Sequence, residues 1–449
     1  RKSNFELFGV QSRIHEINQL PISRLMRRSE LSTQTDRQIA RVSGFDHDGS
    51  ALRILYSPNT TYLYPWTGPM PLLKVEGDPY EMGLSHGRQG RAHIQRLVNT
   101  TWPALELLLK RNKSEIMKDV VQYDEKIKWA HSDFAKEMEG LARGAEVTYE
   151  DIVFLNSQVN ILVMNSVDKG NKIPVYLCSG FTSWGSATSN GEVIACHNDD
   201  GMRITDQFLS LLDATPAKGF RFSIPIIPGY LGYHTVVNEA GLVAFGNALE
   251  YGPKPGEARI GVPLWIIFRY LGQFVSKVEE AIDYLKRASD GITMSFLLAD
   301  KGGNSAIVHS SPNNHVVIRP KNDETHMTMT NHALDDGIKE HLVLRKNPSN
   351  TYYRRQSLEK AIRERYGTID LDKGAEIMST HYDFSSGRDN PSGNTPCRHY
   401  EYAGKFAGTC RSAVVNLGKQ NLRMRVALGN PCVATWVELQ MPYRDSKSK

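Results

Sequence analysis

The sequence predicts an α+β protein in which antiparallel sheets are covered by helices. Helical periodicity dominates residues 78–159, short β-rich runs separated by turns begin near residue 175, and pairs of helices interrupt those runs further along. A doubly wound parallel sheet would need strict strand–helix alternation, which this order lacks, and strands joined by tight turns favour antiparallel pairing. The chain shows no internal repeat.

Length and composition are those of an ordinary globular protein. The chain has 449 residues, 40% of them hydrophobic and 23% charged, and a net charge of +5. Basic and acidic residues are interleaved, so nucleic-acid binding is not expected. No apolar run approaches the roughly 18 residues that a membrane span requires. The first residues do not form a secretory signal, so a reduced, cytoplasmic location is expected.

The first elements are predicted from local signals. Residues 1–70 are polar and end in a turn-rich stretch, so they are expected to be an N-terminal extension. At residues 78–81, Asp-Pro-Tyr-Glu combines a helix cap, a first-turn proline and a glutamate able to close a capping box. One long amphipathic helix is predicted over residues 115–142, and another begins at Thr148.

Strands dominate the rest of the chain. The strongest hairpin signal is Asn190-Gly191, between strands predicted at residues 181–184 and 192–196. A capping box at residues 276–279 begins one of the later helices. Further strands are expected at residues 208–213, 220–227, 234–237, 242–245, 294–299, 305–309, 316–319, 410–417, 422–428 and 433–440. Helices are expected at residues 263–273, 277–288, 351–365 and 371–380, with a Gly/Ser/Asn-rich loop at 385–396.

The cysteine content argues against both a disulfide scaffold and a thiolate metal site. There are five cysteines, an odd number and too few for a scaffold in so long a chain: Cys178, Cys196, Cys397, Cys410 and Cys432. No two of them form a CxxC pair, so a zinc knuckle is not expected. No other ligand cluster has convincing spacing, and we therefore expect no metal and no organic cofactor.

Cys178 is the strongest candidate for a nucleophile. It follows an apolar Val-Tyr-Leu run, where a buried structural cysteine is the commoner interpretation. However, it lies where helical periodicity gives way to the first hairpin strand, and Ser179 and Gly180 leave room around a reactive atom. No histidine is near in sequence. If the bond after Leu177 were cut, the freed α-amine, with an ordinary pKa of about 7.7–8.0, could accept the thiol proton.

Three later polar segments could supply other groups to such a site. Asp200 ends the polar run that follows the second hairpin strand. The amide of Asn331 can donate to a developing oxyanion. Arg398, after the Gly/Ser/Asn-rich loop, can bind a carboxylate or hold an amine in place. A turn or a surface position is the alternative interpretation for each of them.

Together these segments resemble the penicillin acyltransferase-type cysteine hydrolases, the relatives of acyl-coenzyme A:6-aminopenicillanic acid acyltransferase. The resemblance covers about residues 72–440, and the order and spacing of its motifs carry it. The motifs are Glu76–Gly83 with His86-Gly87, Glu139–Ala145, Ile152–Asn156, Cys178, Asn198-x-Asp200, Asn238–Leu242, Thr330–His332 and Cys397-Arg398.

The resemblance implies a fold of the N-terminal-nucleophile hydrolase type, a four-layer αββα sandwich in which residues 71–449 form one catalytic domain. It implies an inactive precursor that cuts itself, with residues 71–177 as the N-terminal chain and residues 178–449 as the catalytic chain. The implied activity is that of an amidohydrolase or acyltransferase. An amide or thioester bond is cleaved through an acyl-enzyme, and the acyl group passes to water or an amine.

The resemblance also implies four catalytic residues. Cys178 attacks, with its own freed amine as the base, and Asn331 donates to the oxyanion. Asp200 supports self-cleavage, and Arg398 holds the hydrogen-bond network. The implied partners are a small-molecule amide or thioester, the cleaved N-terminal chain and a possible second copy of the protein. Gly180 stands where the family often has a hydroxyl residue, and Ser179 or Ser183 could substitute for it.

Two other functions stay open at this point. The chain could be an uncleaved, non-enzymatic binding module with the same fold, in which case pieces of 177 and 272 residues would not form. It could also be a cysteine hydrolase that does not cut itself and uses His332 or His197 as its base.

Overall fold

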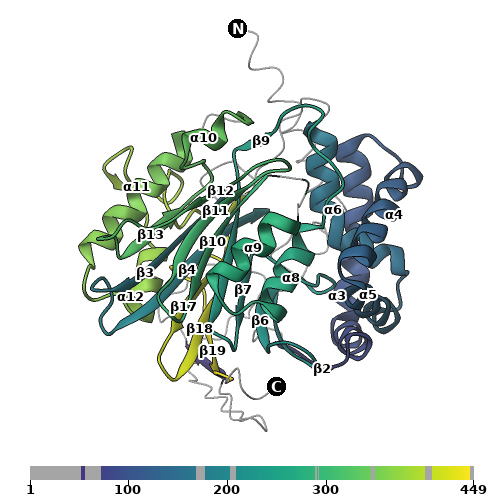
Figure 1. Ribbon diagram of the computed structural model, residues 1–449, viewed down its shortest axis with the longest axis horizontal. Coiled ribbons are helices and arrows are strands. Elements are labelled where there is room, and N and C mark those ends of the chain that lie inside the picture. Colours follow the sequence, from purple (N-terminus) through teal and green to yellow (C-terminus); the bar gives the residue numbers. More distant parts are fainter. Residues whose placement is uncertain are drawn as a thin grey trace, which may run out of the picture.

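Two stacked sheets with helices on both outer sides form the centre of the protein (Figure 1). The computed structural model describes residues 52–55, 72–167, 177–202, 209–288, 291, 293–344, 349–399 and 407–444. In this part of the chain no helix is long and apolar enough to cross a membrane.

The first sheet is antiparallel throughout and has seven strands among the described residues. Its order is β1 (Leu52–Leu55), β19 (Trp436–Pro442), β18 (Asn421–Leu428), β17 (Ala407–Leu417), β4 (Gly191–Met202), β3 (Leu177–Gly185) and β13 (His326–Met329). The predicted hairpin at Asn190-Gly191 is confirmed, since it joins β3 to β4. Strand β1 comes from the predicted extension and pairs with β19, so the proposed boundary at residue 70 stays a prediction.

The second sheet has eight strands among the described residues, and only its β2–β5 pair is parallel. Its order is β12 (His315–Ile318), β11 (Ser305–Ser310), β10 (Met294–Asp300), β8 (Leu242–Ala248), β7 (Thr235–Asn238), β6 (Phe222–Ile226), β5 (Ser210–Pro216) and β2 (Leu72–Gly77). Two small ladders join β9 (Tyr251–Pro253) to β14 (Leu342–Leu344) and β15 (Tyr382–Asp383) to β16 (Arg388–Asp389).

Three apolar cores separate the four layers. Side chains such as Phe245 and Val415 fill the space between the sheets. Helices α11 (Ser349–Glu364) and α12 (Leu371–Met378) cover the first sheet through a core that contains Phe181 and Ile362. Helices α8 (Leu264–Phe274) and α9 (Val278–Ala288) cover the second sheet, where Phe296 is buried. The predicted α+β class and its αββα order are confirmed.

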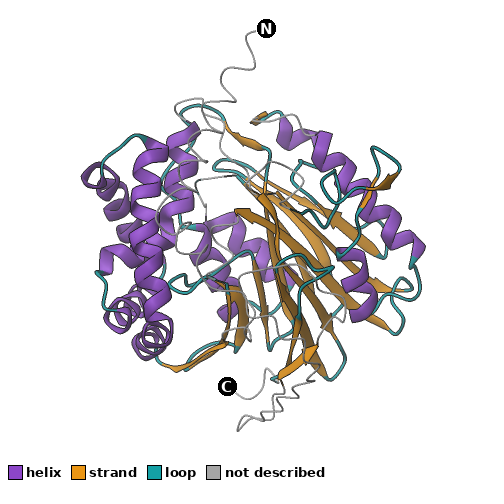
Figure 2. Cartoon of the chain, turned by 180° about the vertical axis from the view of Figure 1, so that it is seen from behind, coloured by secondary structure: helices purple, strands orange, loops and turns teal. Residues whose placement is uncertain are grey.

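A group of four helices stands beside the α8–α9 layer, drawn in blue in Figure 1 and visible as a block of helices at one side of the sheets in Figure 2. Its members are α3 (Pro79–Leu109), α4 (Lys113–Ala130), α5 (Ser132–Ala145) and α6 (Tyr149–Val167). The short helix α10 (Asp336–Lys339) lies near β12 and β14. The predicted start of α3 is confirmed, because Asp78 and Glu81 form a reciprocal capping box ahead of Pro79.

Two details of the helix predictions were wrong. The single helix predicted over residues 115–142 is two helices, because His131, with φ −150° and ψ 72°, breaks the chain between α4 and α5. The apolar spacing hides the break, since both helices bury their apolar faces in the same core. At the start of α9, Ser276 bonds to Glu280 rather than to Glu279, which pairs with Arg319.

The strands that were not predicted are short or lie at edges. Strand β13 at residues 326–329 has the alternating sequence His-Met-Thr-Met, but four residues give too little periodicity to identify it. It is the edge strand next to β3, and it leads directly to Asn331.

The glycines of the recognised motifs let α3 and α5 approach closely. A Cβ atom added to Gly83 would lie 1.9 Å from the carbonyl oxygen of Glu137, and one added to Gly140 would lie 2.1 Å from that of Tyr80. Such contacts are with the backbone, so no side-chain rotation can relieve them. The close contact between α3 and α5 therefore explains why both motifs contain glycine at these positions.

We predict that Gly83→Ala or Gly140→Ala lowers the free energy of unfolding by about 1–3 kcal/mol, because the helices must separate to admit a methyl group. Urea unfolding followed by circular dichroism measures the change. Gly337→Ala is the matched control, since its added Cβ would meet only the side-chain oxygen of Asp335, at 3.0 Å. Equal stability of the Gly83 and Gly337 variants would contradict the close-packing argument.

Candidate active site

Cys178 lies in β3, one residue after the described strand begins, and its side chain is fully buried. Side chains alternate along a strand. Thr182 bonds to Ser305 of the second sheet, whereas Ser179 accepts a hydrogen bond from α11. Cys178 and Thr182 are four residues apart, so they lie on the same face of β3, and Cys178 therefore faces the second sheet. Opposite it in the hairpin register stands Asp199.

Polar groups contact both the nitrogen and the sulfur of Cys178. Its backbone N–H donates to Oδ1 of Asn331 at 2.9 Å, and its Sγ lies 3.5 Å from Oδ1 of Asp199. Burial raises the pKa of the thiol, and the charges of Asp199 and Asp200 raise it further. In this intact chain the sulfur is therefore a neutral thiol that donates to a carboxylate.

Asn331 presents its amide oxygen to Cys178. This oxygen accepts from the Cys178 nitrogen and also from Arg354, at 2.6 Å, while Nδ2 donates to the carbonyl of Ala248 at 2.7 Å. The backbone N–H of Asn331 donates to Oγ1 of Thr351. The side chain is thus fixed at the end of β13 by contacts on both sides of its amide.

Arg354 is a site residue that the sequence reasoning missed. It is completely buried in α11, and its Nη1 donates to the carbonyl of Cys178 at 2.6 Å and to Oγ of Ser179 at 2.9 Å. Burial lowers its pKa to about 10. A signal for it existed, because Arg354 falls on the same helical stripe as the buried Leu358 and Ile362. An arginine on the apolar face of a helix is a candidate for a buried functional contact.

Asp199, next to the predicted Asp200, is the second missed residue. It pairs with Arg411 of β17, whose Nε lies 2.9 Å from Oδ2, and His234 approaches the same oxygen at 3.4 Å. Burial alone would raise the pKa of Asp199, but Arg411 and then His234 outweigh it and hold the pKa well below its usual range. The guanidinium carbon of Arg411 also stacks 3.6 Å above the centre of the Tyr233 ring. Asp199 is therefore permanently charged.

Asp200 has a different environment, although it is equally buried. Its Oδ1 accepts from Oγ1 of Thr409 at 2.8 Å, and its Oδ2 has no hydrogen-bond partner among the described residues. Burial raises the pKa of Asp200 to about 6, against the opposing charges of Arg398 and Arg354. This carboxyl can therefore change its protonation state near neutral pH.

Arg398 is buried and reaches Asp200 through an intermediary. Its backbone N–H donates to Oγ1 of Thr409 at 2.9 Å, and that hydroxyl in turn donates to Asp200. The fold thus brings Cys178, Asp200 and Asn331 together and holds Arg398 beside Asp200. The two carboxylates and the arginines form one buried network around the thiol.

The histidines considered as bases point elsewhere. His197 bonds to Asn247 and Thr235, and burial lowers its pKa to about 4. His332 bonds to Thr330 and Thr351, and burial lowers its pKa to about 3. Within the described part of the chain, neither ring contacts Cys178, so the geometry does not favour a histidine base.

The space next to Gly180 is already filled. A Cβ atom added there would lie 3.0 Å from the carbonyl oxygen of Cys196 and 3.3 Å from the ring of His197. A hydroxyl side chain at this position would displace the imidazole. Ser179 carries a hydroxyl one residue away, but that group accepts from Arg354.

Two surface hollows among the described residues lie away from this network. One is lined by Asn190, Asp370 and Arg425, and the other by Glu81, Arg88 and Thr215, among others. Cys178 lines neither of them. The sulfur is thus presented to neither of these two hollows.

Comparison with known proteins matches part of the chain to one family. The four layers of the fold have the order that the N-terminal-nucleophile hydrolase type implies. Residues 186–381 match the family model of the acyl-coenzyme A:6-aminopenicillanic acid acyl-transferases. The family resemblance predicted from the sequence is thereby confirmed over those residues. The matched segment contains Asp200, Asn331 and Arg354 but neither Cys178 nor Arg398.

A relative with a long alignment is an uncharacterized protein of Archaeoglobus fulgidus. It is 23% identical over an alignment of 349 positions, which covers 68% of this chain and 57% of that protein. The chain thus spans little more than half the length of this relative.

Similar solved structures include hydrolases and an acylase. The Caenorhabditis elegans ortholog of N-acylethanolamine-hydrolyzing acid amidase is 15% identical, with a TM-score of 0.36, over 54% of this chain and 93% of that chain. Penicillin V acylase from Agrobacterium tumefaciens is 16% identical, with a TM-score of 0.38, over 56% and 84%. A conjugated bile acid hydrolase mutant from Clostridium perfringens is 15% identical, with a TM-score of 0.36, over 56% and 89%.

We predict a pH-dependent stability difference at Asp200. Because its folded pKa of about 6 exceeds the ordinary 3.8, the protonated carboxyl favours folding. That contribution is complete below about pH 4 and is lost as pH rises through 6. In a Cys178→Ala background, the parent chain should lose up to about 3 kcal/mol relative to Asp200→Asn between about pH 4 and 7.

Urea unfolding of the two chains at each pH measures this difference, and their shared background keeps both chains intact under the proposed cleavage chemistry. If the difference in free energy of unfolding between the two chains does not change between about pH 4 and 7, the pKa of Asp200 is not raised. If the parent chain instead gains stability relative to Asp200→Asn as the pH rises, Asp200 is stabilised in its charged form.

Proposed function

We propose that this chain is a self-processing cysteine amidohydrolase or acyltransferase with Cys178 as its nucleophile. The observation that carries the proposal is the polar network around that residue, with Asn331 on its nitrogen and Asp199 on its sulfur. A cysteine that only fills a core needs no such partners. The match to an acyltransferase family supports acyl-transfer chemistry.

The proposed self-cleavage is an acyl shift followed by hydrolysis. Sγ of Cys178 attacks the carbonyl carbon of Leu177 and loses its proton. The peptide C–N bond breaks as the Cys178 nitrogen takes up a proton, which leaves a thioester on the sulfur and a free α-amine. Water then hydrolyses the thioester to give the Leu177 carboxylate and the thiol. Asp200 suits the role of proton carrier, because its pKa of about 6 lies near neutral pH.

The proposed mature reaction uses the same atoms with one new group. The α-amine of Cys178 takes the thiol proton, the sulfur attacks an amide or thioester carbonyl of a small molecule, and the acyl group moves to Sγ. The amine leaving group departs with a proton. Water then releases the acid, or an amine accepts the acyl group. We favour hydrolysis, because an amine acceptor needs an additional binding pocket.

Each buried neighbour has a distinct proposed part in this reaction. Asp199 stays charged through Arg411 and orients the thiol, since a carboxylate with so low a pKa is a poor base. The amide oxygen of Asn331 fixes the Cys178 nitrogen. Its amide nitrogen, which donates to the carbonyl of Ala248 in the intact chain, is the proposed oxyanion donor of the mature enzyme. Arg398 acts on Asp200 through Thr409, so we assign it a positioning role.

We predict that Cys178→Ala prevents cleavage of the chain. The wild-type chain should yield pieces of 177 and 272 residues, whereas the variant should remain a single chain of 449 residues. Intact mass spectrometry after timed incubation distinguishes the two. Cys196→Ala, a substitution of another fully buried cysteine, is the control and should still be cleaved.

A wild-type chain that stays whole after long incubation would speak against self-processing and for a binding module of the same fold. Cleavage of the Cys178→Ala chain at the same bond would exclude this nucleophile. Incubating the cleaved protein with a metabolite extract and finding the mass of an acyl group on the Cys178 peptide would identify the substrate class.

We predict that Arg354→Lys slows self-cleavage at least about tenfold. A lysine keeps the charge but has one nitrogen in place of the two by which Arg354 reaches Cys178, Ser179 and Asn331. Losing one charged hydrogen bond costs roughly 1.5–3 kcal/mol. The rate of appearance of the 272-residue piece measures the effect. Arg355→Lys is the matched control, because among the described residues the side chain of Arg355 bonds to Thr328 and pairs with Glu359, away from Cys178. Equal rates in the two variants would remove Arg354 from the mechanism.

A further inference from the structure

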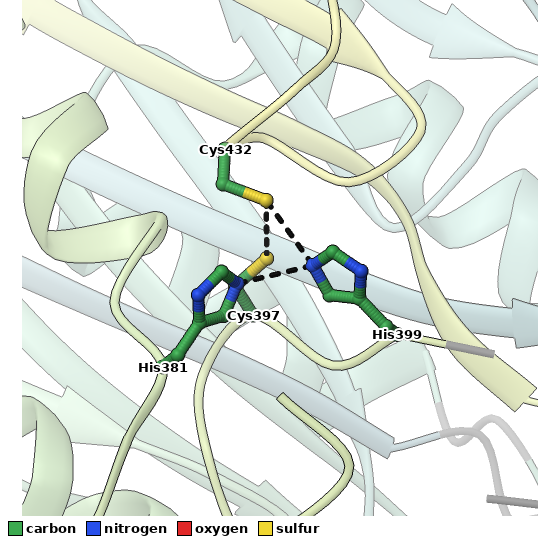
Figure 3. Close-up of side chains that lie close together, drawn as sticks. All are labelled: His381, Cys397, His399 and Cys432. Atoms are coloured by element: carbon green, nitrogen blue, oxygen red, sulfur yellow. Dashed lines mark hydrogen bonds between the residues drawn. The ribbon is translucent and has the colours of Figure 1, made fainter. Parts of the chain in front are cut away.

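Four metal-ligating side chains converge at a point outside the candidate active site. His381 follows α12, Cys397 and His399 follow β16, and Cys432 lies between β18 and β19. Their sulfur and ring-nitrogen atoms all lie within 4.8 Å of one another. Figure 3 shows the two sulfurs and the two imidazoles pointing toward a common centre. Three separate segments of the chain therefore supply one compact group.

The distances within this group match the edges of a tetrahedral zinc site. The two sulfurs lie 3.6 Å apart, the two Nε2 atoms 3.0 Å apart, and Nε2 of His399 lies 3.2 Å from Sγ of Cys432. Zinc bonds of about 2.3 Å to sulfur and about 2.0 Å to nitrogen require edges of about 3.8, 3.3 and 3.5 Å respectively. We propose that His381, Cys397, His399 and Cys432 bind one structural zinc ion.

The alternatives account for the arrangement less well. A disulfide needs sulfurs about 2.05 Å apart, far closer than the 3.6 Å between Cys397 and Cys432. Simple core packing would not bring two imidazoles and two thiols together with their polar atoms inward. Two cysteines and two histidines are a ligand set typical of zinc.

The surroundings also fit a closed structural site. Cys397 is fully buried, whereas the other three side chains are half-buried, so the group lies close to the protein surface. Nδ2 of Asn430 lies 4.0 Å from the sulfur of Cys397, a position suited to a weak hydrogen bond to a thiolate. All four ligands come from the protein, which leaves no open position for substrate.

The zinc would hold the segment that carries Arg398. Arg398 stands between two of the ligands, and its backbone N–H and C=O both bond to Thr409. Thr409 in turn donates to Asp200. The proposed ion thus stabilises the loop that presents Arg398 to the buried carboxylates, without touching them.

The test is the metal content of the full chain, purified without a polyhistidine tag from zinc-containing medium. We expect about one zinc ion per chain by elemental mass spectrometry. Cys432→Ser and His399→Asn should each lose most of that zinc. Cys196→Ala and His315→Asn are the controls, since they alter a cysteine and a half-buried histidine outside the cluster, and should retain it.

Cobalt provides a second readout that depends on geometry rather than on purification. Adding Co²⁺ alone to the chelator-treated wild-type chain should give the visible bands of tetrahedral cobalt and a thiolate charge-transfer band. His399→Asn should lose them. If Cys432→Ser fails to fold, the cobalt spectrum of the wild type and the zinc content of His399→Asn still decide the question.

Three results would overturn the proposal. The first is a wild-type chain that contains no zinc and gives no cobalt bands. The second is an unchanged zinc content in both ligand variants. The third is a Cys397–Cys432 disulfide in protein kept under reductant, found by peptide mapping. None of these outcomes depends on self-cleavage or on activity, so they leave the proposed function to its own tests.

Discussion

Two adjacent aspartates buried at the end of β4 set the constraint on which the site depends. An unpaired charge in a protein interior costs several kcal/mol, so each carboxylate needs a partner. Strand β17 supplies both, and an irregularity in its register makes this possible. Thr409 stands opposite Asp200 and Arg411 opposite Asp199, with Cys410 as the extra residue between them. In a regular ladder, two residues on one face of β17 could not face two consecutive residues of β4.

Most of the architecture could be predicted because its signals are local. The capping box at Asp78 and the Asn-Gly turn at Asn190 each depend on neighbours in sequence, and both are confirmed. The site could be predicted only in part. Asp199 and Arg411 stand 212 residues apart and meet through strand register, which no local pattern specifies. The position of Arg354 on an apolar helical stripe could be recognised in the sequence. Its hydrogen-bond partners follow only from the packing of α11 on β3.

The metal-ligating cluster is a second arrangement that local sequence patterns could not predict. The sequence reasoning expected no zinc because no CxxC pair exists, and that rule covers only sites built from neighbouring residues. Here Cys397 and His399 are two residues apart, but Cys432 arrives through the turn before β19 and His381 through the end of α12. Such a site is created by tertiary structure. The loop that carries Cys397 and His399 also carries Arg398. The stability of this loop is therefore linked to the electrostatic potential at the buried carboxylates.

The proposed chemistry explains why Arg354 is buried where it is. In the intact chain the nitrogen of Cys178 is an amide and cannot act as a base, and the thiol has a raised pKa. Cleavage would turn that nitrogen into an amine at the same place. The nearby aspartates would favour its protonated form, in which it cannot accept a proton from the thiol. Burial and the charge of Arg354, which shares Oδ1 of Asn331 with this nitrogen, act in the opposite direction. A lone carboxylate pair would hold the amine as an ammonium, so an effective base at this position requires the arginine as well.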